Sequence, residues 1–165
     1  MIEQQKYRNP ETPSELLVRW LKRLRESQFA HNEAAKKFDR CRYFIGIPAS
    51  ILSTIVGTSV FASLGKTVDP YMQIVVGLIS VLAAVLSALQ TLLRYSERAE
   101  MHRSSAVRYG CIRRRVEEVL ATKNNDHELN TDIDPIRKEI DDLAKDSPNF
   151  SDKIWDKASK QALKS

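Results

Sequence analysis

Two uncharged stretches decide the fold: YFIGIPASILSTIVGTSVFASLG at residues 43–65 and PYMQIVVGLISVLAAVLSALQTLL at residues 70–93. Each is longer than the roughly 20 apolar residues that a helix needs to cross a bilayer. Gly65 is a plausible helix stop, and Asp69-Pro70 supplies an N-cap and a first helical residue. The pattern therefore predicts two transmembrane helices joined by a short external loop, residues 66–69. A buried hairpin in a soluble bundle is disfavoured, because few other apolar residues could cover it.

The charges of the chain lie on both sides of this block. The chain has 165 residues and a formal net charge of +5. Residues 1–42 carry ten Lys/Arg and six Asp/Glu, residues 94–115 carry seven Arg and two Glu, and residues 116–165 carry eight basic and twelve acidic residues. Arginines flank both spans, whereas the loop holds only Lys66. The bias predicts that both termini are cytoplasmic and that four arginines anchor the helix ends at the membrane surface. These anchors are Arg40, Arg42, Arg94 and Arg98.

The sequence outside the spans predicts cytoplasmic helices. Thr12, Pro13 and Glu15 form a helix start with a capping box. Apolar and small residues then recur at steps of three and four on each side of the spans, which is typical of packed helices. The first seam is Leu17, Trp20, Leu24, Ser27, His31, Ala34 and Phe38; the second is Ala99, His102, Ala106, Tyr109, Ile112, Val116 and Val119. We expect each span to continue into a cytoplasmic helix without a break and the two seams to pack together.

The predicted fold class is an all-α membrane protein, a two-transmembrane hairpin whose helices extend into a cytoplasmic helical bundle. Its segments are an N-terminal cytoplasmic helix (1–42), the spans and their loop, a cytoplasmic helical arm (94–121) and C-terminal cytoplasmic helices (122–165). Within the last segment, residues 122–135 are polar and predict an exposed linker. One helix is expected to start at Asp134-Pro135 and another after Pro148.

Two histidines are expected to meet in the cytoplasmic arms. Residues whose numbers add up to about 135 lie at the same height of the hairpin, and His31 and His102 nearly satisfy this relation. With Tyr109 they form a candidate contact between the arms. Two interpretations stay open: neutral histidines that pack and hydrogen-bond, or a protonation switch. The ligands visible in the sequence are too few for a metal site, and no cofactor is predicted.

Each span also has one face of small or weakly polar side chains. These candidate residues are Ser50, Ser53, Thr54 and Gly57 in the first span and Gln73, Gly77, Ser80, Ala84, Ser87 and Thr91 in the second. Such a face allows close packing of helices. Alternatively, hydroxyl-bearing faces from several subunits line a water path, which requires a homo-oligomer because one hairpin cannot enclose a pore.

The sequence disfavours other classes of function. No nucleophile–base pair or carboxylate constellation predicts an enzyme, and no catalytic residue is proposed. The arginines after the second span are explained by contact with membrane lipid, and few aromatic residues accompany them, so nucleic acid is a disfavoured partner. A structural membrane adaptor, whose helical arms recruit a cytoplasmic protein, remains as an alternative to a pore-forming effector.

Two longer stretches resemble the SLATT family, the two-transmembrane effector domains of bacterial conflict systems. They are FAHNEAAKKFDRCRYFIGIPASILSTIVGTSVF and LSALQTLLRYSERAEMHRSSAVRYGCIRRRVEEVL, with His31, Pro48, Gly57, His102 and Tyr109 among the matching residues. The resemblance implies an antiviral effector of the bacterial inner membrane that assembles and breaches the membrane when a sensor fires. It also implies an operon-encoded sensor or nucleotide second-messenger system as partner.

Overall fold

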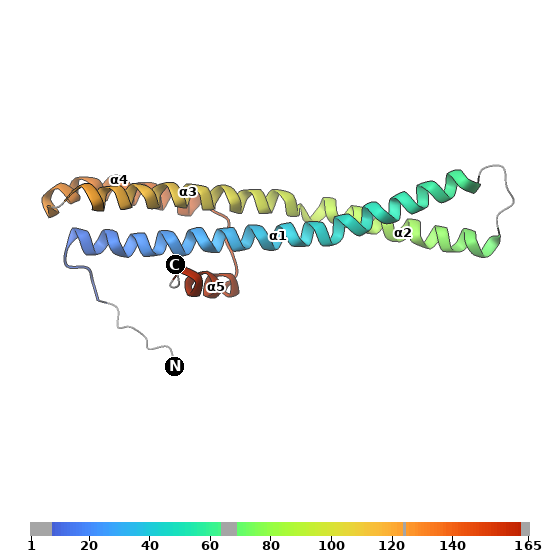
Figure 1. The fold of residues 1–165 in the computed structure, drawn as a ribbon, viewed down its shortest axis with the longest axis horizontal. Helices are drawn as coiled ribbons and strands as arrows, with labels where there is room; N and C mark the ends of the chain where they lie inside the picture. The colour runs from blue at the N-terminus through green and yellow to red at the C-terminus, as the bar shows by residue number, and fades with distance from the viewer. Residues whose placement is uncertain (1–7, 64–68, 124, 163–165) are drawn as a thin grey trace, which may run out of the picture. The chain divides into compact units, whose positions relative to one another are not determined.

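The structure is a computed structural model that describes residues 8–63, 69–123 and 125–162. These residues form helices and connecting segments without any β-strand. The helices are α1 (Pro13–Ser63), α2 (Pro70–Leu93), α3 (Tyr95–Thr122), α4 (Asp126–Asp146) and α5 (Asp152–Ala162) (Figure 1). The predicted all-α fold class is confirmed. Of the predicted loop, only Asp69 belongs to the described residues; Lys66 lies outside them.

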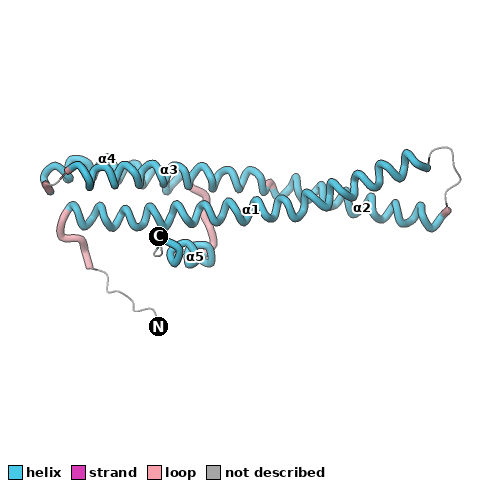
Figure 2. The backbone as a smooth tube through the Cα atoms, viewed as in Figure 1, coloured by secondary structure: helices cyan, strands magenta, loops and turns pink. Residues whose placement is uncertain are grey.

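Helix α1 is continuous from the polar N-terminal segment into the first apolar stretch. Thr12 Oγ1 accepts a hydrogen bond from the Glu15 amide at 3.2 Å, which caps the helix as expected. The Glu15 carboxylate reaches back to the amide of Glu11 at 2.9 Å, one residue earlier than in a standard capping box. Pro48 lies inside the helix, and the helical assignment runs through it unbroken (Figure 2).

The chain forms two compact units, residues 1–34 with 101–165, and residues 35–100. The first unit is a helical bundle with one apolar core. All seven residues expected for the second seam are buried, although Ala99 belongs to the other unit. The core of the bundle consists of Leu17, Leu24, Tyr109, Ile112, Val116, Val119, Leu129, Ile136 and Leu143. Burying one leucine of this kind stabilises the fold by about 1.5–3 kcal/mol, so hydrophobic packing holds the bundle together.

The prediction of a linker at residues 122–135 was wrong, although most of the described residues in this range are exposed as expected. Helix α4 already begins at Asp126, and the side chain of Asn125 caps it by accepting from the His127 amide at 3.3 Å. Pro135 lies inside the helix, although a proline there removes a hydrogen bond and costs about 3 kcal/mol. Burial of Leu129 on the same face as Ile136 offsets this cost, because both side chains enter the core.

The acidic α4 and the arginines of α3 pair with each other. Figure 1 shows α4 beside α3, and Arg108 binds Asp146 at 3.3 Å while Arg115 binds Glu139. These ion pairs are about half exposed, so each contributes little on its own. They do explain part of the arginine-rich stretch: two of its side chains neutralise acids of the same bundle.

The second unit contains the two apolar stretches. Ala49 of α1 and Ala83 of α2 are buried, and a Cβ placed on Gly46 would lie 3.1 Å from Nε2 of Gln90. Small residues thus bring α1 and α2 together. The large apolar side chains point away from this contact: Phe44, Ile47, Ile51, Ile55, Val60, Phe61, Tyr71, Met72, Ile74, Leu78, Val81, Leu82, Val85, Leu89 and Leu92 are exposed.

This exposure suits a lipid environment. Both helices are long and apolar enough to cross a membrane, and few residues of their apolar segments are buried. A core helix of a soluble protein would bury most of such a segment. The two helices therefore fit an inner membrane protein.

A single residue separates α2 from α3. Arg94 has φ 46° and ψ 39°, which is left-handed backbone, and no other non-glycine residue in the described ranges has a positive φ. The carbonyl of Arg94 already accepts from the Arg98 amide at 3.1 Å, so the next helix begins at once. The expected unbroken passage from the second span into the arm is thus corrected: α2 ends at Leu93 and α3 begins at Tyr95 (Figure 2).

Candidate functional site

The ten candidate residues of the two apolar helices lie mostly outside the contact between α1 and α2, which is made by other small residues. Gly57 and Ser80 are partly buried, whereas the other eight candidates are exposed. Those eight are Ser50, Ser53, Thr54, Gln73, Gly77, Ala84, Ser87 and Thr91. The contact itself uses different residues, with Ala49 and Ala83 at its centre. The small side chains are therefore not needed for this hairpin to close.

Two glycines among the candidate residues are also not needed for the contact between α1 and α2. A Cβ placed on Gly57 or Gly77 would meet no neighbouring atom within 4 Å. A glycine inside a helix costs about 1 kcal/mol relative to alanine. No contact in the described chain makes use of these two positions, so their small size is available to a helix from elsewhere.

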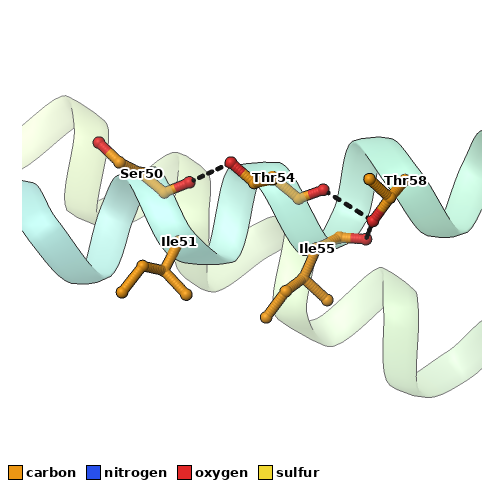
Figure 3. A pocket seen from close by; sticks show the side chains of 5 residues that line it. All are labelled: Ser50, Ile51, Thr54, Ile55 and Thr58. Atoms are coloured by element: carbon orange, nitrogen blue, oxygen red, sulfur yellow. Dashed lines mark hydrogen bonds between the residues drawn. The ribbon is translucent and has the colours of Figure 1, made fainter.

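The hydroxyl groups on this face bond to their own helices. Figure 3 shows an open groove along α1 lined by Ser50, Ile51, Thr54, Ile55 and Thr58. Thr54 Oγ1 donates to the Ser50 carbonyl at 2.9 Å, and Thr58 Oγ1 contacts the carbonyls of Thr54 and Ile55 at 3.0 Å each. In α2, Ser80 donates in the same way to the Val76 carbonyl at 2.9 Å. Each hydroxyl hydrogen is thereby satisfied, while the oxygen can still accept a bond from water.

The small residues of α1 and α2 lie on one side of the hairpin. The buried or half-buried contact row is Ala49, Leu52 and Val56 in α1 and Val76, Ile79, Ala83 and Leu86 in α2. Ser50, Ser53 and Gly57, and Gly77, Ser80, Ala84 and Ser87, each directly follow a member of that row. One residue is about 100° of helix rotation. Because α1 and α2 are antiparallel, a step of one residue toward the C-terminus leads from the contact row to the same side of the hairpin in both helices. We call this surface, formed by the ten candidate residues, the small-residue face.

The helical bundle of the first unit holds a buried histidine pair. His31 of α1 and His102 of α3 are 1% and 3% exposed, and their Nδ1 atoms lie 3.0 Å apart. Such a bond requires that one Nδ1 carries a proton and the other does not. The structure thus brings together two residues that are 71 positions apart in the chain. Neutral histidines would pack and hydrogen-bond here, whereas a switch would require that the pair gains a proton.

Aromatic rings enclose this pair. The ring of Tyr109 stacks on His31 with centroids 5.3 Å apart, and Phe150 meets His31 edge-on at 5.0 Å. Phe150 in turn stacks on Trp155 of α5 at 5.9 Å. Phe150 was missed by the sequence reasoning, because a single aromatic residue in a short connection has no periodic pattern to mark it.

Burial keeps both histidines neutral. It lowers the pKa of His31 from 6.5 to about 4, and the nearby His102 contributes a smaller lowering by charge repulsion. The pKa of His102 is also lowered by burial. A protonated pair would place two positive charges at hydrogen-bond distance. Among the described residues, no group of three or more His, Cys, Asp or Glu side chains is placed to hold a metal ion.

The four candidate anchors lie at the ends of the apolar segments. Arg40, Arg94 and Arg98 are exposed and Arg42 is half-buried. The Arg42 guanidinium lies 5.3 Å from the ring centroid of Tyr43, its own neighbour in the chain. Arg94 pairs with Glu97 at 2.8 Å. These positions leave the guanidinium groups accessible to lipid phosphates.

A second close approach in the bundle was also missed. Gly110 of α3 is buried against Gln28 of α1, and a Cβ on Gly110 would lie 2.7 Å from Nε2 of Gln28. Glycine therefore makes room for a polar side chain in the seam. The absence of a side chain at Gly110 was visible in the sequence, but its partner was not.

A comparison with protein-family models identifies one family. The model described as "SMODS and SLOG-associating 2TM effector domain family 4" matches residues 21–165. The match includes both apolar segments, the histidine pair and α3 to α5. Comparisons with curated proteins and with solved structures found no match.

Proposed function

Because the chain belongs to the SMODS and SLOG-associating 2TM effector domain family, we propose that it oligomerises through its small-residue face and opens a pore in the bacterial inner membrane. One observation carries this proposal: the hairpin leaves that face uncovered, including two glycines whose missing side chains no described contact uses. In a bilayer, small residues of this kind are where helices approach one another. A second copy of the chain is the occupant that fits, since it offers the same face.

The chemistry of the small-residue face suits a pore that forms from single hairpins already inserted in the membrane. The hydroxyl hydrogens of Thr54, Ser80 and Thr91 are bonded within their own helices, which lowers the cost of exposing these side chains to lipid in a single hairpin. Their oxygens accept bonds from water once several hairpins surround a common axis. Two helices cannot enclose such an axis, so the activity requires assembly.

The trigger comes from outside this chain. The family name associates the domain with SMODS and SLOG partners, and the family resemblance suggests a sensor or nucleotide second-messenger system in antiviral defence. The cytoplasmic bundle is the part that would receive this signal.

An adaptor function is the second candidate. Met101 and Val107 are 53% and 60% exposed on α3, and Val18 of α1 is 55% exposed. Exposed apolar side chains on an ordered bundle can dock another protein. An adaptor would bind its partner without making the membrane permeable.

Release of a small dye from lipid vesicles tests the pore against the adaptor. We expect the purified full chain, reconstituted at increasing protein-to-lipid ratios, to release dye with a steeper than linear dependence on protein, because several subunits form one opening. Crosslinking of the same vesicles should show oligomers at the ratios that leak. Vesicles that stay sealed while the protein is inserted and oligomeric would argue for the adaptor.

Both termini are expected to face the cytoplasm, because Arg40, Arg42, Arg94 and Arg98 flank the spans on that side. The test uses Thr67→Cys in a chain that also carries Cys41→Ser and Cys111→Ser. A membrane-impermeant thiol reagent should label this variant in intact cells, whereas a matched Ser159→Cys variant should react only after lysis. Labelling of the second variant alone in intact cells would reverse the orientation.

A further inference from the structure

The junction between α2 and α3 is strained at a residue that is not a glycine. Left-handed backbone brings Cβ of an ordinary L-residue too close to the following carbonyl, and a non-glycine residue adopts it only where its surroundings hold it there. Arg94 has φ 46° and ψ 39°. Its exposed ion pair with Glu97, at 2.8 Å, is too weak to impose this conformation. The packing of the helices on either side must hold it.

The residues that face α1 lie on different sides of the helix before and after Arg94. In α2 the contact row passes through Ala83 and Leu86 to Leu93. In an unbroken helix, steps of four and three would continue it to Glu97 and Glu100, but both are exposed. The residues that face α1 are instead Tyr95, whose ring lies 6.1 Å from that of Phe38, and Ala99, which is 1% exposed. This shift of about two residues is about 200° of helix rotation in one direction, which is the same as about 160° in the other.

A right-handed Arg94 would therefore present another face of α2 to α1. Counting back from Ala99 and Tyr95 in steps of three and four residues gives the row that would then meet α1. All of its residues are now exposed: Ile74, Leu78, Val81, Val85, Ala88 and Leu92. This row is apolar, as is most of the present one, so lipid accepts either face. The turn would also carry the small residues of α2 to the opposite side of the hairpin from those of α1.

We propose that Arg94 is a hinge that turns α2 about its axis by about 160° when it changes between left-handed and right-handed backbone. The left-handed state assembles the small-residue face from both helices, and the right-handed state breaks it. This regulatory role rests on the proposed function of that face, but the rotation itself can be measured without it.

The test compares Arg94→Gly with Arg94→Ala in the full chain carrying Cys41→Ser and Cys111→Ser. Both substitutions remove the guanidinium, and they differ in whether left-handed backbone is permitted. Gly46→Cys with Gln90→Cys reports the observed face, because residues 46 and 90 are in contact there. Gly46→Cys with Ala88→Cys reports the turned face. We expect the ratio of the 46–90 to the 46–88 crosslink in membranes to be about 5- to 30-fold higher for Arg94→Gly than for Arg94→Ala.

A third variant excludes a general effect of glycine. Arg94→Asn should resemble Arg94→Gly, since asparagine tolerates left-handed backbone. Equal crosslink ratios in the glycine and alanine variants, or no crosslink at either pair, would overturn the hinge. Dye release should be higher in Arg94→Gly than in Arg94→Ala, since both variants lack the guanidinium of the candidate anchor and differ only in the backbone that they permit. A crosslink shift without that difference would leave the hinge standing and remove the small-residue face from the function.

Discussion

The double variant Ser80→Leu with Ser87→Leu is expected to lose at least about nine tenths of its dye release, equivalent to about 1.4 kcal/mol in association. The two serines are seven residues apart and therefore share one side of α2. Ser80 is half-buried and Ser87 exposed in the single chain. Leucine there forces neighbouring hairpins apart if the face packs, and it narrows and dries the lumen if the face lines a pore.

The matched control places two conservative substitutions on the opposite side of α2. Leu78→Ile with Val85→Leu alters two exposed apolar side chains and should release dye like the parent. Crosslinking then separates two mechanisms: an absent oligomer in the leucine variant identifies a packing face, and an intact oligomer that no longer leaks identifies a pore lining. Unchanged release at equal expression would exclude the small-residue face from the activity.

Acidification is expected to loosen the helical bundle of the first unit. The pKa of His31 is about 4 in the folded chain and 6.5 in the unfolded one, because burial opposes its charge. Between these pH values the unfolded chain binds more protons, so stability is present above 6.5 and is lost as the pH falls. From about pH 7 to about pH 5 the expected loss from His31 alone is about 2 kcal/mol, and the lowered pKa of His102 acts in the same direction.

Denaturant unfolding followed by tryptophan fluorescence measures this loss. Both tryptophans of the chain, Trp20 and Trp155, lie in the first unit, the helical bundle, and report on it. The variant His31→Gln with His102→Gln has no imidazole in the pair, so its stability should change much less over the same range. A parent chain whose unfolding midpoint is as flat as that of the double variant would rule out the pair as a source of pH dependence.

Those parts of the fold that follow from long periodic patterns were predictable from the sequence. The apolar length of residues 70–93 coincides with the bounds of α2, and the spacing of Ala99 to Val119 coincides with a buried row of α3. Hairpin symmetry places His31 opposite His102. In each case many residues contribute to one signal, so a local irregularity does not hide it.

What the sequence did not reveal depends on single residues. Nothing marks Arg94 as left-handed, because arginine has no preference for that conformation and the packing on both sides selects it. Pro135 looked like a helix start, since the burial of Leu129 ahead of it cannot be judged without α3 in place. The side of the hairpin on which Ser50 and Ser87 meet depends on which rows of α1 and α2 touch, and the sequence alone left that choice open.

The hydrogen bonds from Thr54 and Ser80 to their own helices bear on how the protein accumulates in a cell. Because part of the hydroxyl hydrogens is already bonded within each helix, lipid tolerates a single hairpin, and newly synthesised copies can stay monomeric in the bilayer. Under the proposed function, assembly then responds to the number of copies and to the orientation of α2. Harm to the membrane would rise sharply above a threshold dose, which leaves low basal amounts harmless to the cell that makes them.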